Sequence, residues 1–63
     1  MTIYINSDKV EVSPGMTIGD AVKSYSHELF QQLTRGQIKV YDRFGNQTEP
    51  DGPLKAGQQL VLK

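Results

Sequence analysis

Residues 2–12 read TIYINSDKVEV, and this stretch decides how the chain begins to fold. Apolar and polar residues alternate in both halves, with Ile3 and Ile5 in the first half and two valines in the second. A period of two is typical of a β-strand that buries one face. The polar residues 6–9 favour a turn between the halves. We therefore predict a β-hairpin, ended by the Ser-Pro-Gly at 13–15 because proline cannot continue a strand ladder.

A single amphipathic helix is predicted after this hairpin. Thr17 suits the N-cap, and Asp20 lies three residues later, where a carboxylate suits the helix dipole. Apolar residues then recur at spacings that form one stripe along an α-helix: Ile18, Ala21, Val22, Tyr25, Leu29 and Leu33. Gly36 follows a basic last turn and suits the C-cap. Weak helix formers within the segment favour fraying or a break before that end: Ser24, Ser26 and Thr34.

Three shorter segments follow the helix. Residues 37–42 alternate again, residues 47–53 are polar and read as a short edge strand or irregular loop, and residues 59–62 form a last strand. Strands around one helix predict a single α+β domain over residues 1–63, with a mixed sheet of four to five strands packed on that helix in the order β-β-α-β-(β)-β. The predicted core consists of Ile3, Ile5, Val10, Val12, Ile18, Val22, Leu29, Ile38, Val40, Leu54, Leu60 and Leu62.

Composition narrows the classes of function. The chain has 63 residues, no cysteine, one histidine, and seven cationic against seven acidic side chains. A neutral total argues against a nucleic-acid partner and favours weak self-association. No apolar run is long enough to span a bilayer and no signal peptide precedes the hairpin, so we expect a cytoplasmic protein without a membrane partner. Neither a Cys–His pair nor a serine with an evident base is present, so we expect no enzyme and no cofactor.

The element order resembles the β-grasp, or ubiquitin-like, fold, in which the first and last strands lie parallel at the centre of the sheet. Three motifs resemble the small sulfur-carrier proteins of thiamin and molybdopterin synthesis: Ile-x-Ile-Asn at residues 3–6, PGMTIGDAV at 14–22 and GPLKAGQQL at 52–60. This resemblance covers nearly the whole chain. Residues 21–27, AVKSYSH, also resemble the TGS domain, a regulatory β-grasp module of synthetases and GTPases.

One departure from the sulfur carriers bears on function. Carriers work through a C-terminal Gly-Gly, whose carboxylate is adenylated and converted to a thiocarboxylate. The sequence ends Val-Leu-Lys at residues 61–63, and Gln58 stands where carriers typically have an acidic residue. We therefore expect a function on the folded surface. Two alternatives stay open: a degenerate or processed sulfur carrier, and a TGS-like domain that binds a small ligand or RNA.

Aromatic residues are the candidate binding residues. Tyr4 and Tyr41 alternate with the core residues of their strands, so both are expected on the sheet face away from the helix. Exposed aromatic side chains are typical anchors of protein interfaces. With Phe44 in a turn and Phe30 beside the helix stripe, they predict a noncatalytic module that binds an unidentified protein. The alternative is that these rings only cover the sheet, or stack as a cross-strand pair.

Two further groups of residues have both a possible binding role and a structural one. Gly15 and Gly19 flank the helix start, where backbone N–H groups could hold an anion, although a structural cap is the better interpretation. The carboxylates of Asp42, Glu49 and Asp51 could approach one another and hold Ca²⁺. Their spacing matches no metal-binding loop, so we expect solvated turn residues instead.

Overall fold

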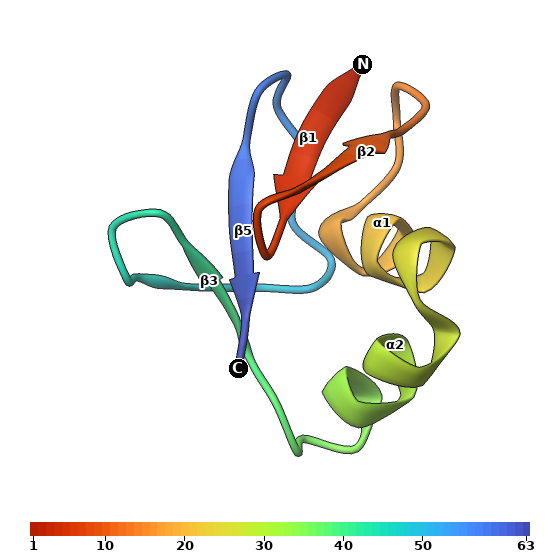
Figure 1. The fold of residues 1–63 in the computed structure, drawn as a ribbon. Coiled ribbons are helices and arrows are strands. Elements are labelled where there is room, and N and C mark those ends of the chain that lie inside the picture. The colour runs from red at the N-terminus through yellow and green to blue at the C-terminus, as the bar shows by residue number, and fades with distance from the viewer.

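A computed structural model describes residues 1–63. Its elements follow in the order β1 (Thr2–Ile5), β2 (Asp8–Glu11), α1 (Ile18–Tyr25), α2 (His27–Thr34), β3 (Val40–Asp42), β4 (Gln47–Thr48) and β5 (Gln59–Leu62). The fold is α+β, with one mixed five-stranded sheet and both helices on the same face of that sheet (Figure 1). The predicted hairpin at residues 2–12 is confirmed.

The strands lie in the order β2-β1-β5-β3-β4, so the first and last strands of the chain are neighbours inside the sheet. β1 and β5 run parallel, as expected, and every other neighbouring pair is antiparallel. Both edges are short, and the β2 edge carries charged side chains. These features protect a sheet from pairing with another chain. Of the polar segment 47–53, only Gln47–Thr48 forms a strand.

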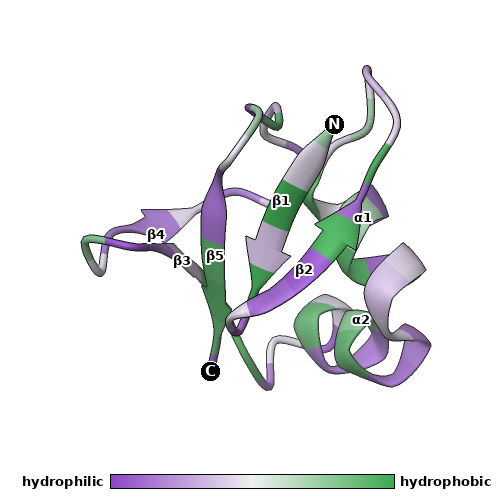
Figure 2. Ribbon diagram, turned by 45° about the horizontal axis from the view of Figure 1, so that its top comes forward, coloured by the Kyte–Doolittle hydropathy of each residue, from purple (hydrophilic) through white to green (hydrophobic).

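Alternation along the strands separates a buried face from an exposed one. Figure 2 shows hydrophobic and more polar residues alternating along β1, and the same period places Leu60 and Leu62 of β5 in the core. Nine apolar residues are buried: Ile3, Ile5, Val12, Ile18, Ala21, Val22, Val40, Leu60 and Leu62. Four predicted core residues are only half-buried and pack around this cluster: Val10, Leu29, Ile38 and Leu54.

The prediction of one helix is wrong, because the chain forms two helices that meet at Ser26. The Ser26 backbone is extended, with φ −154° and ψ 115°. Its N–H still donates to the Val22 carbonyl, which closes α1, and its hydroxyl accepts from the Leu29 N–H at 3.3 Å, which begins α2. Serine favours this N-cap geometry over a helix interior. One residue therefore ends the first helix and caps the second.

The ends of the helical segment agree with the sequence. At the start, Thr17 and Asp20 form a capping box, with each side chain accepting from the other residue's backbone N–H at 3.1 Å. After α2, Gly36 has φ +77°, the left-handed conformation common after a helix. Between these ends, the Tyr25 hydroxyl donates to the Asp8 carboxylate and ties α1 to β2. This bond, with smaller contributions from burial and the Asp8 charge, raises the pKa of Tyr25.

The start of α1 is closed by the loop before β5. The N–H of Ile18 donates to the Gly52 carbonyl at 3.1 Å, and that of Gly19 donates to the Pro50 carbonyl at 2.6 Å. A Cβ at Gly19 would lie 3.1 Å from the same Pro50 oxygen, so the close approach favours glycine. The N–H groups of Ile18 and Gly19 are therefore bonded to backbone oxygens of the chain, which confirms the prediction of a structural cap at this helix start.

Candidate functional site

One face of the sheet is left without a covering helix, and we call it the open face. The register identifies its residues, because directly opposite residues of an antiparallel pair share a face. Tyr4 lies opposite Lys9 of β2 and beside Gln59 of β5, while Tyr41 lies opposite Val61. The strand residues that face outward here are Thr2, Tyr4, Lys9, Glu11, Tyr41, Gln47, Gln59 and Val61.

Two tyrosines and one valine form the apolar part of this face. Tyr4 and Val61 are each 36% exposed, and Tyr41 is partly buried. Strand β5 lies between the two tyrosines, so the prediction of a cross-strand pair is wrong for them. The Lys63 ammonium lies 5.3 Å from the Tyr41 ring centroid, within the range of a cation–π contact. The face thus combines aromatic, aliphatic and cationic groups.

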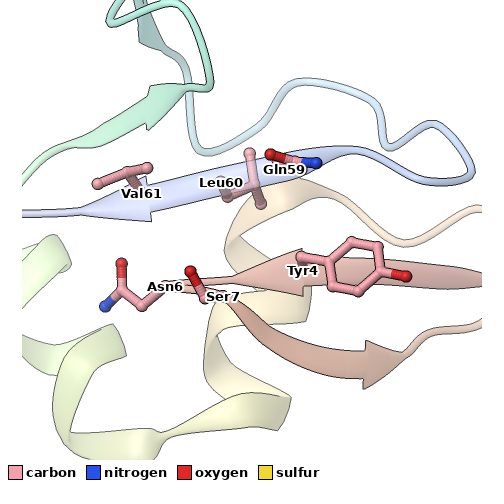
Figure 3. Close-up of a pocket in the computed structure, with 6 residues that line it drawn as sticks. All are labelled: Tyr4, Asn6, Ser7, Gln59, Leu60 and Val61. Carbon is pink, nitrogen blue, oxygen red and sulfur yellow. The ribbon is translucent and has the colours of Figure 1, made fainter.

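A shallow hollow of about 400 Å³ lies between the end of β1 and β5. It is lined by Tyr4, Asn6, Ser7, Gln59, Leu60 and Val61 (Figure 3). Asn6 and Ser7 form the tight turn of the hairpin, with φ +50° and +72°. Two consecutive positive φ angles are typical of a tight hairpin turn. Both residues line the hollow.

Asn6 also shapes the hollow through its side chain. Its backbone N–H donates to the Leu60 carbonyl at 2.9 Å, and its Oδ1 accepts from the Leu62 N–H at 2.9 Å. The backbone turns away from β5 at this point, so the amide oxygen supplies the next hydrogen bond of the parallel ladder. Asn6 therefore makes two hydrogen bonds to the β1 side of β5, and these hold the strand where Leu60 lines the hollow.

A second hollow of about 310 Å³ adjoins the first at Gln59, which lines both. It separates the β3–β4 turn, which includes Arg43 and Phe44, from residues 55–59. Phe44 is 74% exposed, and the Arg43 guanidinium lies 4.8 Å from its ring centroid. An exposed phenylalanine at the edge of a hollow is a strong candidate anchor.

Asp42 holds the turn that presents Phe44. Its Oδ1 accepts from the N–H groups of Asn46 and Phe44, each at 2.9 Å. These bonds stabilise the ionised carboxylate, and the Asn46 N–H contributes most, so the pKa of Asp42 falls below its ordinary value. This carboxylate serves the turn. No set of three His, Cys, Asp or Glu side chains in the structure is arranged to hold a metal ion.

Phe30 lies apart from the other three aromatic candidates. It belongs to α2, on the opposite side of the sheet, and is partly buried. The Lys23 ammonium lies 5.6 Å from its ring centroid. The structure therefore brings Tyr4, Tyr41 and Phe44 to the open face and its adjoining hollow, and it leaves Phe30 on the helical side.

Comparisons with known proteins leave the site to be interpreted from its geometry. Searches against protein-family models, curated proteins and solved structures found no match to the chain. Neither α1 nor α2 has the length and apolar character that crossing a bilayer requires.

Val61 and Gln59 lie beside the two tyrosines on the open face, and the sequence did not single out either of them as a binding residue. Val61 lies in an apolar run between Leu60 and Leu62, and the predicted core includes only these two neighbours. The alternation used for β1 would have placed it outward, opposite to its neighbours. Its position beside Tyr41 needed the pairing of β3 with β5, which no local pattern contains.

Proposed function

We propose that this protein is a noncatalytic interaction module with a β-grasp fold, and that it binds another protein through the open face. The fold proposal is supported by the strand order and by the parallel pairing of β1 with β5 inside the sheet. The two helices between β2 and β3 differ from the single helix of the resemblance. The helical segment still connects β2 to β3, so the break at Ser26 leaves the order of the strands as the resemblance predicts.

One observation carries the functional proposal: exposed Tyr4 and Val61 lie with Tyr41 on a sheet face that no other element of the chain covers. Tyrosine combines a large apolar surface with a hydrogen-bonding hydroxyl, and it is enriched among interface anchors. The neighbouring hollow widens the surface that a partner could fill. Neither the sulfur-carrier alternative nor the TGS-like alternative gains a specific observation of this kind.

The test is a double variant, Tyr4→Ala with Tyr41→Ala, used beside Phe30→Ala as a matched aromatic control on the helical side. A photo-crosslinker at Gln59 of each protein would be activated in a lysate of cells that make the protein, and crosslinked proteins identified by mass spectrometry. We expect partners of the native chain to persist with Phe30→Ala and to be lost with the double variant. A double variant that is folded by circular dichroism and retains every partner would refute the proposal.

A further inference from the structure

The fold separates charges that balance over the chain. Five of the seven cationic side chains lie on the open face, beside it or at the second hollow: Lys9, Lys39, Arg43, Lys55 and Lys63. Only two of the seven acidic side chains, Glu11 and Asp42, lie there. The rest of the surface therefore holds two cations and five carboxylates. A neutral chain thus has an excess of cations at the open face and its adjoining hollow.

Two of these lysines lie directly opposite each other. The Lys39 N–H donates to the Lys63 carbonyl at 3.0 Å, and the Lys63 N–H donates to the Lys39 carbonyl at 3.2 Å. These two bonds extend the pairing of β3 with β5 by one residue pair. Side chains of such a pair share a face, and the alternation from Tyr41 places them on the open face. Like charges directly opposite each other are unfavourable in a sheet. An anionic group bound between them would relieve this repulsion.

The two carboxylates in this region are engaged by groups of the chain itself. Glu11 accepts a hydrogen bond from the Thr2 hydroxyl, and Asp42 accepts from the N–H groups of its own turn. Lys63 and Arg43, in contrast, contact aromatic rings, which leaves their donors available to a partner's carboxylates. The rim of the open face is thus cationic and its centre, around Val61, is apolar.

We infer that the partner of the open face presents an acidic protein segment, in which aspartate or glutamate side chains surround an apolar side chain that packs on Val61. This inference rests on the proposed function and adds the chemistry of the partner. Interfaces commonly combine an apolar centre with a charged rim, and complementary charge selects the partner and speeds its approach.

A protein segment fits this face better than single-stranded nucleic acid does. Nucleic-acid surfaces of this kind stack bases on open aromatic faces. The ammonium of Lys63 lies near the Tyr41 ring, and β5 separates that ring from Tyr4. An aliphatic centre such as Val61 offers no stacking surface and suits an apolar side chain.

The experiment titrates the ¹⁵N-labelled chain with poly-L-glutamate and, separately, with poly-uridylate. The test variant is Lys39→Gln with Lys63→Gln, and the control is Lys23→Gln with Arg35→Gln, which removes two charges from the helical side. We expect poly-glutamate to shift the amides of Tyr41 and Val61, with about tenfold weaker binding in the test variant and native binding in the control. Raising salt from about 0.1 M to about 1 M shortens the Debye length from about 10 Å to about 3 Å and should abolish the shifts.

Two results would overturn the inference. The first is binding of poly-uridylate with no response to poly-glutamate, or shifts of poly-glutamate confined to α1 and α2. The second is a crosslinked partner that depends on Tyr4 and Tyr41 but stays bound to the Lys39→Gln, Lys63→Gln variant at about 1 M salt. That second result would leave the proposed function standing while rejecting an acidic partner. If no crosslinked partner depends on Tyr4 and Tyr41, both the proposed function and this inference are rejected.

Discussion

Replacing Asn6 should lower the stability of the domain more than its position in an exposed turn suggests. Its Oδ1 accepts from the Leu62 N–H at 2.9 Å, and these residues lie 56 positions apart in the chain. Leu62 is only 8% exposed, so its N–H has little access to water as a substitute. Asn6 also has φ +50°, a conformation that asparagine tolerates better than most residues.

Three substitutions separate these two roles. Asn6→Gly removes the acceptor but suits the positive φ, so it should cost about 1–2 kcal/mol, the contribution of one hydrogen bond with a partner left unsatisfied. Asn6→Ala loses the same bond and adds about 1 kcal/mol of left-handed strain, for a total of about 2–3 kcal/mol. Asn6→Asp keeps an acceptor oxygen and the tolerance for this conformation, so its cost should stay below about 0.5 kcal/mol.

The assay is thermal and urea unfolding followed by circular dichroism. In a domain of this size, each kcal/mol shifts the Tm by about 4–8 °C, so the order Asp, Gly, Ala should be well resolved. Hydrogen exchange adds a local readout, because the Leu62 amide should exchange faster in Asn6→Gly. The reasoning is refuted if Asn6→Gly has the same Tm as the native chain and the same exchange rate at the Leu62 amide. In that case the hydrogen bond from Leu62 to the Asn6 side chain contributes nothing to stability.

Three other substitutions test local features. Ser7→Gly should raise the free energy of unfolding by about 0.5–1 kcal/mol, because Ser7 has φ +72°; a lower Tm would contradict this. Ser26→Ala should lower the free energy of unfolding by about 1 kcal/mol, because the N-cap of α2 is lost. The control Ser24→Ala, at an exposed site within α1, should leave it unchanged. Equal effects of the two substitutions in chemical denaturation would argue against the cap. Asp42 has a lowered pKa, so its contribution is present above the ordinary value of 3.8 and is lost as the pH falls. The stability difference between the native chain and Asp42→Asn should therefore shrink on acidification below that value, and a constant difference in urea titrations would exclude this linkage.

Local patterns were sufficient for most of the elements. Alternation placed the hairpin, and the spacing of apolar residues with Thr17 and Gly36 placed both ends of the helical segment. The break at Ser26 was only indicated as weak helix propensity, because the choice between a helix interior and an N-cap depends on what each turn packs against. Leu29 and Ile38 were expected in the core but are half-buried, since burial depends on neighbours from other elements.

Some features of the candidate site could likewise be predicted from local sequence patterns, and others could not. The outward direction of Tyr4 and Tyr41 followed from strand alternation, whereas their separation by β5 did not. Nor did the neutral composition indicate a cationic face, because charges distant in sequence gather only when strands pair. By itself, then, the sequence determined the short-range periods, caps and turns, which depend on contacts within a few residues. Only the tertiary structure decided which strands are neighbours, and with them the hollow at Gln59, the Lys39–Lys63 pair and the bond from Leu62 to Asn6.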